Sequence, residues 1–298
     1  MPFTITRQPT TTSYRGPSRL ANGTPVTLAG QLHENHDGSP IPGRTLRMAV
    51  GSGEHRQACT GTTNASGTAR CTIRSVDQPL NAAATVPVQV QFAGDPYYLP
   101  SSKSATALLE YYTGRAYGLT ATIGLPLVPL VSLSPTPDTG PVRTARASES
   151  TTPCVAEVDA AVLLTSDVVC PKVTTRLAPG TSTSTATVEQ TRIGLPGLPV
   201  IEVRGATATS TSTCGSGGSA TGNTGLELYI GGRRVPVTAE VNAEVDLPGV
   251  ARLVVNEQKP VAGADHGLTV NAVHLTAAGG NTDIVMASAT SDVHNCAR

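Results

Sequence analysis

The sequence is poor in aromatic and charged residues. Its 298 residues include no Trp, 2 Phe and 7 Tyr, and 14% are charged, with 21 Lys plus Arg balancing 21 Asp plus Glu. Lysine occurs only at Lys103, Lys172 and Lys259. Because there is no basic stripe, a nucleic-acid partner is not expected. Because there is no polybasic tract, amphipathic helix or apolar run of about 20 residues, direct membrane insertion is not expected either.

The abundant residue types favour strands and turns. Thr, Ser, Ala and Val fill much of the chain, together with 30 Gly and 23 Pro. Val and Thr favour strands, whereas Gly and Pro mark turns. We therefore predict an all-β protein without helices. A chain of 298 residues is long enough for two domains, at about 100–200 residues each.

The ends of the sequence bear on its location. The start, MPFTITRQPTTTSY, lacks the charged and apolar segments of a signal peptide. We expect an extracellular or cell-surface protein whose signal peptide has been removed and to which Met1 has been added. The alternative is a phage virion protein with Met1 as its genuine start. The end, DVHNCAR, has no hydrophobic tail or sorting motif, so the mode of anchoring stays open.

Two cysteines flank a turn-like sequence in residues 58–72, ACTGTTNASGTARCT. If this stretch folds as an antiparallel hairpin, Cys59 and Cys71 lie directly opposite each other, with Cβ atoms about 4.5–5.5 Å apart. A disulfide can span that distance. The alternative is two free thiols in a cytosolic protein. No C-x-x-C spacing indicates zinc or redox chemistry, so we predict a disulfide and an oxidising compartment.

Short alternating segments flank this stretch, and they predict about seven strands in a β-sandwich over residues 1–113. Four motifs occur in order: GQL, GSPIPGRTL, CTGTTNASGTARC and FAGDPYYLPSS. Together they closely resemble bacterial Ig-like repeats of secreted and surface proteins. The resemblance implies an immunoglobulin-like fold and a role as a spacer or stalk, and sometimes as an adhesive unit.

Residues 114–298 have a different texture. Residues 181–191 (TSTSTATVEQT) and 205–214 (GATATSTSTC) alternate hydroxyl and small apolar side chains, which is typical of strands with one solvated face. The alternative is a disordered, mucin-like stalk. The stretch LELYIGGRRVPV (226–237) predicts a hairpin around Gly231-Gly232. We predict a second, larger β-sandwich that contains disulfides.

This half resembles the choice-of-anchor P family of secreted actinobacterial proteins. The resemblance rests on motifs in residues 116–119 (AYGL), 134–137 (SPTP), 253–258 (LVVNEQ), 267–275 (GLTVNAVHL) and the closing DIVMAS…HNC. It implies a secreted or surface location and no known chemistry.

Four further cysteines lie in this half: Cys154, Cys170, Cys214 and Cys296. Of their three possible pairings we prefer Cys154–Cys170, which closes a strand-loop-strand unit, together with Cys214–Cys296, which would pin the last strand to the middle of the domain. The sequence alone leaves the connectivity open.

Two groups of residues are candidates for chemistry, and neither indicates a cofactor. His33, His36 and Asp37 in the segment HENHD are weak candidates for metal ligands, but we favour a solvated turn between two strands, where polar residues are ordinary. Glu257 and His274, assisted by Asn256 and Asn271, suggest the base and imidazole of a hydrolase. The alternative is a polar ladder at the rim of a sheet.

The only concentrated aromatic rings are five tyrosines near the predicted domain junction. They provide a possible binding surface for a glycan, although packing between the sandwiches explains them as well. These residues are Tyr97, Tyr98, Tyr111, Tyr112 and Tyr117.

Taken together, the sequence predicts a non-enzymatic, secreted or cell-surface structural or adhesive protein. Exposed strand edges favour self-association, and a cell-wall or surface polymer is the other expected partner. The alternatives are a glycan-binding module, a phage virion surface protein and, last, a hydrolase.

Overall fold

The chain is described by a computed structural model for residues 6–124, 130–160, 163–238, 240–247, 251–277 and 281–297. Met1, and with it the expectation about the start of the chain, lies outside these residues. The chain divides into two compact units, Met1–Tyr111 with Asn295–Arg298, and Tyr112–His294. The last residues therefore group with the first unit, whereas the sequence placed them in the second.

The described residues form strands and one short 3-10 turn, Gly53–His55, which confirms the all-β prediction. Among them, no helix is long and apolar enough to cross a membrane. The strands of the first unit are β1 (Thr10–Tyr14), β2 (Arg19–Leu20), β3 (Val26–Glu34), β4 (Thr45–Val50), β5 (Gln57–Thr62), β6 (Thr68–Ile73), β7 (Thr85–Phe92) and β8 (Ser101–Leu109).

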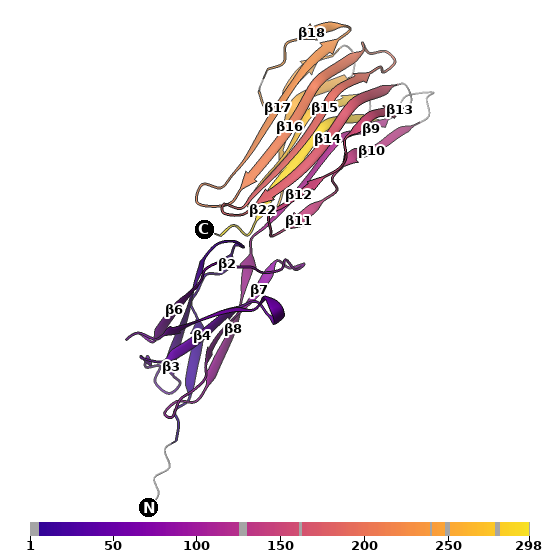
Figure 1. Cartoon of the computed structure of the whole chain (residues 1–298). Helices are drawn as coiled ribbons and strands as arrows, with labels where there is room; N and C mark the ends of the chain where they lie inside the picture. Colours follow the sequence, from indigo (N-terminus) through magenta and orange to yellow (C-terminus); the bar gives the residue numbers. More distant parts are fainter. Residues whose placement is uncertain are drawn as a thin grey trace, which may run out of the picture. The chain divides into compact units, whose positions relative to one another are not determined.

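The first unit is a sandwich of a three-stranded sheet, β1-β3-β6, and a five-stranded sheet, β2-β8-β7-β4-β5 (Figure 1). Because side chains alternate along a strand, every second side chain of each sheet points into the layer between the two sheets. A Cβ at Gly30 of β3 would lie 2.7 Å from Val90 of β7 and 3.3 Å from Leu46 of β4. Large aliphatic side chains fill this layer, with Leu28 and Met48 fully buried.

The first disulfide joins the two sheets of this unit. Cys59 and Cys71 are bonded, with Cα atoms 5.8 Å apart, as predicted. The predicted hairpin is wrong, because β5 pairs with β4 in one sheet and β6 pairs with β3 in the other. The chain crosses between the sheets in a turn in which Gly67 N donates to Asn64 O over 2.8 Å. Gly61 permits the close approach, since a Cβ there would lie 2.3 Å from Arg70 O.

The second unit contains longer strands. They are β9 (Tyr111–Ile123), β10 (Val131–Asp138), β11 (Val142–Thr144), β12 (Ser148–Thr151), β13 (Val155–Ala160), β14 (Leu164–Arg176), β15 (Thr181–Ile193), β16 (Ile201–Thr213), β17 (Ser219–Ile230), β18 (Arg233–Val235), β19 (Ala243–Asp246), β20 (Ala251–Pro260), β21 (His266–Ala277) and β22 (Thr282–His294).

These strands form a second sandwich of two seven-stranded sheets (Figure 1). One sheet has the order β12-β14-β15-β16-β17-β18, with β13 beside β14, and the other has the order β10-β9-β22-β21-β20-β19, with β11 beside β9. The predicted hairpin is confirmed, because Ile230 pairs with Arg233, and Gly231 and Gly232 have φ values of 57° and 77°. The mucin-like alternative is wrong, since both Thr/Ser-rich stretches lie in strands.

Aliphatic side chains from both sheets form one core in the second unit, including Leu119, Leu164, Ile201, Leu275 and Ile284. The part of β15 and β16 that is rich in Ser and Thr has a different inner layer. There the fully buried Ser182, Ser184, Ser210 and Ser212 point toward the opposite sheet. Their Oγ atoms donate to backbone carbonyls of Thr113, Thr290, Leu268 and Ser291 over 2.7, 2.5, 2.7 and 2.9 Å.

All six cysteines are disulfide-bonded, and the described residues contain no free thiol. Cys154 and Cys170 form the second bond, with Cα atoms 4.4 Å apart, as predicted. Cys214 and Cys296 are disulfide-bonded as well. Around Cys296, Arg19 Nη1 donates to its carbonyl over 3.0 Å, and Ala297 N donates to Glu110 Oε2 over 2.9 Å. Three disulfides are typical of extracellular proteins.

Candidate functional site

The candidate hydrolase residues form a charged cluster on adjacent strands β20, β21 and β22. Glu257 Oε1 lies 3.0 Å from His274 Nδ1, and Asp283 Oδ2 lies 3.1 Å from His274 Nε2. Asn271 Nδ2 donates to Glu257 Oε2 over 2.7 Å, and Lys259 Nζ lies 2.8 Å from Glu257 Oε1. The structure therefore brings Glu257, His274 and Asn271 together, as the hydrolase hypothesis requires. It also creates the polar ladder of the alternative.

A local irregularity of the strands places these side chains on one face. Asn271 and His274 are three residues apart, so in a regular strand they would point to opposite faces. Between them, Ala272 and Val273 both belong to the core, which shows that the alternation shifts there. On the neighbouring strand β20, Asn256 has a φ of 52°. The residue pairs before and after it, Val255–Val273 and Glu257–Asn271, follow the same register between β20 and β21. Asn is among the few residue types that tolerate this left-handed conformation.

The electrostatics keep Glu257 ionised. Its side chain is 8% exposed, and this burial by itself would raise the pKa of the carboxyl group. Hydrogen bonds from Lys259, His274 and Asn271 outweigh the burial and lower the pKa of Glu257 below its ordinary value. The carboxylate is therefore a stable anion with three donors around it.

The imidazole of His274 has a carboxylate at each ring nitrogen. A carboxylate only accepts hydrogen bonds, so both contacts are complete when the ring carries two protons. A general base needs a nitrogen that reaches the proton of a substrate or nucleophile. Here Glu257 and Asp283 occupy both positions. Both ring nitrogens of His274 are therefore in contact with carboxylates of neighbouring strands. The buried Oδ1 of Asn271 accepts no hydrogen bond from the described residues.

Asn256 lies outside this cluster. Its Nδ2 donates to Glu240 O over 3.3 Å, and its Oδ1 accepts from Gln258 Nε2 over 2.9 Å. The first of these bonds connects the segment before β19 to β20.

The weak metal-ligand candidates of the first unit lie near the end of β3 and in the turn that follows it. Asp37 accepts hydrogen bonds from Ser39 Oγ and Ser39 N over 2.7 and 2.8 Å, and these bonds lower the pKa of its carboxyl group. His33 pairs with Thr11 of β1 and with Pro40. Among the described residues, His33, His36 and Asp37 do not bring their ligand atoms within 4.8 Å of one another. The geometry corresponds to the solvated turn.

The five tyrosines do not form one platform. Tyr97 is 62% exposed, whereas Tyr112 is 1% exposed and cannot offer its ring. Tyr98 donates to Glu34 Oε1 over 3.0 Å, and Tyr117 stacks with Arg115, whose Cζ lies 5.6 Å from the ring centre. Tyr111 is half-buried at the start of β9. Of this set, only Tyr97 presents a largely exposed ring.

A hollow of about 530 Å³ lies in the first unit between the β3–β4 connection and the end of β7. Arg44, Arg47, Gln91 and Asp95 supply its polar walls. Arg44 Nε lies 2.6 Å from Asp95 Oδ2, and its guanidinium lies 5.4 Å from the centre of the Tyr98 ring. Asp95 also accepts from the Tyr97 backbone N–H over 2.8 Å, so the hollow and the exposed ring share one loop.

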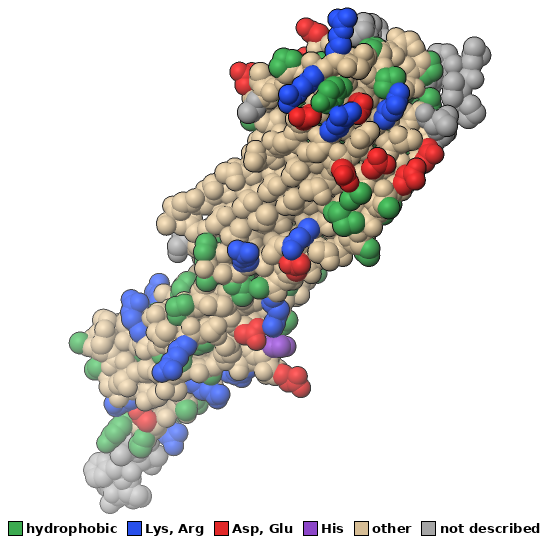
Figure 2. All heavy atoms as spheres, turned by 45° about the horizontal axis from the view of Figure 1, so that its top comes forward, with side chains coloured by type: hydrophobic (Ala, Val, Ile, Leu, Met, Phe, Trp, Pro, Cys, Tyr) green, Lys and Arg blue, Asp and Glu red, His purple; other side chains and the backbone are tan. Residues whose placement is uncertain are grey.

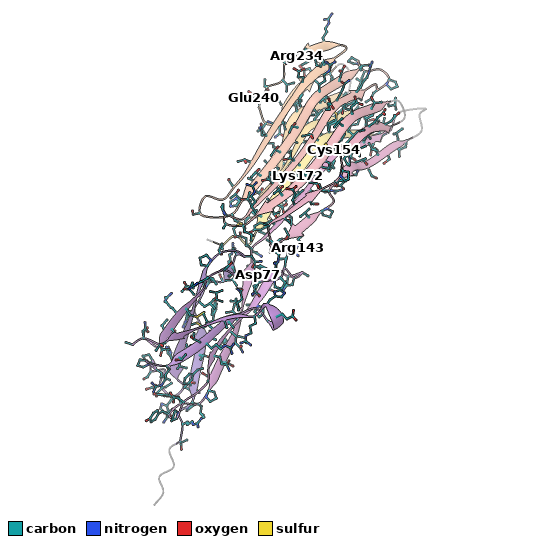
Figure 3. All side chains as sticks on the ribbon, in the orientation of Figure 1. Asp77, Arg143, Cys154, Lys172, Arg234 and Glu240 are labelled. Carbon is teal, nitrogen blue, oxygen red and sulfur yellow. A yellow bond between two sulfur atoms is a disulfide. The ribbon has the colours of Figure 1, made fainter. Side chains whose placement is uncertain are left out.

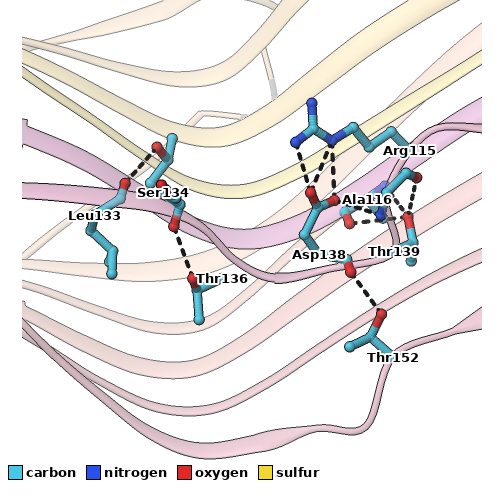
Figure 4. A network of polar contacts seen from close by, with 10 residues as sticks. Arg115, Ala116, Leu133, Ser134, Thr136, Asp138, Thr139 and Thr152 are labelled. Atoms are coloured by element: carbon cyan, nitrogen blue, oxygen red, sulfur yellow. Dashed lines mark hydrogen bonds and ion pairs between the residues drawn. The ribbon is translucent and has the colours of Figure 1, made fainter.

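A second polar network, which the sequence did not indicate, joins β9 to β10 (Figure 4). Arg115 donates to both oxygens of Asp138, with Nη2 2.7 Å from Oδ2. Gly140 N donates to Asp138 Oδ1 over 2.9 Å, and Thr152 Oγ1 donates to Asp138 O over 2.8 Å. Burial of Asp138 acts to raise the pKa of its carboxyl group, but the hydrogen bonds from Arg115 and Gly140 outweigh it and lower the pKa. The network fixes an edge strand.

The outer face of β15 and β16 carries a regular array of eight threonines, which we call the threonine array. Four directly opposed pairs form it: Thr181–Thr213, Thr183–Thr211, Thr185–Thr209 and Thr187–Thr207. All eight side chains are half-buried. Figure 2 shows a broad band over this sheet in which neither charged nor hydrophobic side chains gather.

A hollow of about 670 Å³ borders the threonine array on the β14 side. Thr181, Thr183 and Thr185 line it, together with Lys172 and Arg176 of β14. Lys172, labelled in Figure 3, lies 2.9 Å from Glu149, so this border of the array is charged while the array itself is neutral.

Strand β17 forms an edge of the same sheet. It pairs with β16 from Ser219 to Ile230, but β18 covers it only from Leu228 to Ile230. Within the described residues, no other strand pairs with the part from Ser219 to Glu227. This part contains no charged side chain before Glu227. An uncharged, unpaired edge of this kind can template pairing with another chain.

Comparison of the chain with protein-family models, curated proteins and solved structures finds no match.

Proposed function

We propose that this chain is a non-enzymatic, extracellular protein with a structural and adhesive role. The first unit is a spacer, and the second presents the surfaces that contact further copies of the chain. The three disulfides support a location in an oxidising compartment. The resemblance of the first half to bacterial Ig-like repeats, and of the second half to the choice-of-anchor P family, supports the same location and role.

The edge of β17 is the observation that carries the proposal. An exposed strand with its backbone donors and acceptors free on one side is usually protected by charge, proline or a covering element. Between Ser219 and Glu227, β17 contains neither charge nor proline. Pairing of two such edges would join the β12–β18 sheets of two copies by backbone hydrogen bonds.

The arrangement around His274 supports the non-enzymatic part of the proposal. Both ring nitrogens face carboxylates of neighbouring strands, so catalysis would first have to break one of these contacts.

Light scattering over a concentration series tests self-association. We expect the mean mass of the full chain to rise with concentration. The variant Asn223→Lys places a charge on the exposed edge strand β17 and should keep the chain monomeric. Thr122→Lys adds the same charge on β9, at a position that is also exposed, and should behave as the wild type. A wild-type chain that stays monomeric throughout would contradict the proposal.

Secretion has its own test. Mass spectrometry of the protein isolated from its native source is expected to find an N-terminus produced by signal-peptide cleavage, and to find it in the medium or cell-surface fraction. A native chain recovered only from the cytoplasm with reduced cysteines would exclude the extracellular role.

A glycan-binding role is the second candidate, and the hollow beside Tyr97 favours it. Arginine, glutamine and aspartate side chains beside an exposed ring can bond the hydroxyl groups of a sugar and stack on its face. In a glycan array, Tyr97→Ala and Arg47→Ala should each weaken any binding of the wild type, whereas Tyr229→Ala in the second unit should not. Wild-type chain that binds no glycan would remove this candidate.

A further inference from the structure

The geometry of the threonine array points to an ordered water lattice as its partner: we propose that this face binds ice. Its four rows repeat along two strands without a break in register from Thr181–Thr213 to Thr187–Thr207. Neighbouring strands lie about 4.7–4.9 Å apart, and alternate residues of one strand lie about 6.4–6.8 Å apart. Both repeats come close to those between water molecules on a prism face of ice.

Each threonine offers the two groups that such a surface requires. Its hydroxyl group both donates and accepts hydrogen bonds, so it can replace a water molecule in the lattice. Its methyl group stands beside the hydroxyl and favours release of less ordered water. Because threonine is branched at Cβ, few side-chain rotamers are available and little entropy is lost on binding. The neighbouring strands extend the pattern, since Thr174 pairs with Thr183 and Thr221 pairs with Thr211.

The absence of charge on the array also favours ice over an ionic partner. The array contains no ionisable side chain, and its opposed hydroxyls also contact one another, with Thr183 Oγ1 3.2 Å from Thr211 Oγ1. A neutral surface of hydroxyl and methyl groups has no preference for an ionic polymer. It also lacks aromatic rings, on which sugar-binding surfaces usually stack their ligands.

The layer beneath the array fixes its spacing. Ser184, Ser210 and Ser212 alternate with the array threonines along β15 and β16 and bond to backbone carbonyls of the opposite sheet. At Gly114 of β9, a Cβ would lie 2.8 Å from Val173 and 2.9 Å from Ser184, so the sheets approach closely there. A lattice partner needs this rigidity, because every row must fit at once.

Ice itself is the probe. A single ice crystal is held in a solution of the full chain, and the difference between its melting and freezing temperatures is measured. The fraction of protein that partitions into slowly growing ice is measured in parallel. We expect the wild type to separate the two temperatures and to enter the ice. The double variant Thr185→Lys/Thr209→Lys, at two opposed positions in the centre of the array, should lose most of both effects.

A matched control uses an opposed pair on the other sheet. Thr122 of β9 pairs with Ser132 of β10, and both are exposed. The double variant Thr122→Lys/Ser132→Lys adds the same charges and should keep wild-type activity. If the lysines in the array impair folding, as judged by circular dichroism, Thr209→Ala removes one hydroxyl and methyl without added charge and should still lower both effects.

Three results would overturn the proposal. A wild-type chain that neither separates the two temperatures nor enters ice would do so, as would equal losses in the array and control variants. The third is an array variant that keeps its effect on ice but loses self-association or binding to a polysaccharide, because the array would then be a contact for that partner. Ice binding does not require pairing through β17, so Asn223→Lys should leave it in place.

Discussion

The two units of the chain build their inner layers in different ways. In the first unit, large aliphatic side chains such as Leu28, Leu46 and Met48 fill the space between the sheets. In the Ser/Thr-rich part of the second unit, serines bridge directly to the backbone of the opposite sheet. A layer of large side chains derives its stability from volume removed from water. A layer of small hydroxyl side chains brings the backbones close and depends on hydrogen bonds. In the second unit, strands β15 and β16 are therefore tied to the opposite sheet by hydrogen bonds as well as by packing.

The largest expected effect comes from removing volume in the first unit. Leu46→Ala should lower the free energy of unfolding by about 2–5 kcal/mol, because Leu46 is fully buried and the cavity would not close completely. Hydrogen exchange read by mass spectrometry should show lost protection in β3, β4 and β7, with β15 and β16 unchanged. Leu99→Ala, at a position that is 41% exposed, is the control. Equal loss of protection in β15 would show that the effect of the lost volume is not confined to the first unit.

The disulfide between the sheets of the first unit should have the next largest effect. Replacing Cys59 and Cys71 together by alanine removes a cross-link with a sequence separation of 12 residues. A short loop of this kind stabilises the folded state by about 3 kcal/mol. Because the bond joins β5 to β6 across the sandwich, we expect faster hydrogen exchange in both sheets of this unit. If the loss were confined to β5, the bond would act within one sheet only.

The sequence predicted this bond but not its place, and the reason is instructive. The segment between Cys59 and Cys71 looks the same whether its two strands pair with each other or with different sheets. The choice depends on β3 and β4, which offer pairing partners on either side. The Gly231-Gly232 hairpin was predictable because its turn requires two positive φ values that glycine alone adopts readily.

The candidate site, too, was predictable from the sequence only in part. Glu257, His274 and Asn271 could be named as candidates from their chemistry. That their side chains contact one another depends on the shifted alternation beside Asn256, which no periodic pattern in the sequence shows. No motif in the sequence indicates Asp283 as the second partner of His274. The threonine array was visible as a solvated face of each strand. Its two-dimensional order was not, because the register between β15 and β16 is set by tertiary pairing.

A smaller effect tests the hydroxyl layer of the second unit. Ser212→Ala removes the donor to Ser291 O and the 2.9 Å contact with Ser291 Oγ. Because these groups are buried, the loss should be about 1–3 kcal/mol. Ser132→Ala, on an exposed position of β10, should change the stability little. Urea unfolding of the two variants measures the difference. A neutral Ser212→Ala would mean that close packing alone holds the sheets.

The smallest expected effect is a difference between the two units in how their stability depends on pH. The pKa of Glu257 in the folded chain lies below its ordinary value of 4.5. The unfolded chain therefore binds the proton more readily, and the stabilisation is fully present above pH 4.5. It is lost as the pH falls through the lower, folded value. The carboxyl groups with lowered pKa values in the first unit, Asp37 and Asp95, lie in surface turns, where water screens their interactions.

Acid should therefore destabilise the second unit before the first. This is the opposite of Leu46→Ala, which should destabilise the first unit only. The protection of amides in β20, β21 and β22 against hydrogen exchange, corrected for the intrinsic effect of pH, should fall as the pH is lowered below about 4.5, before the protection in β3 and β4 changes. Glu257→Gln should remove most of this difference, because the neutral amide does not titrate. Glu244→Gln on β19 is the matched control, since Glu244 contacts Arg252 at the exposed surface. If Glu244→Gln abolished the pH dependence as fully as Glu257→Gln, the buried cluster around His274 would not be its source.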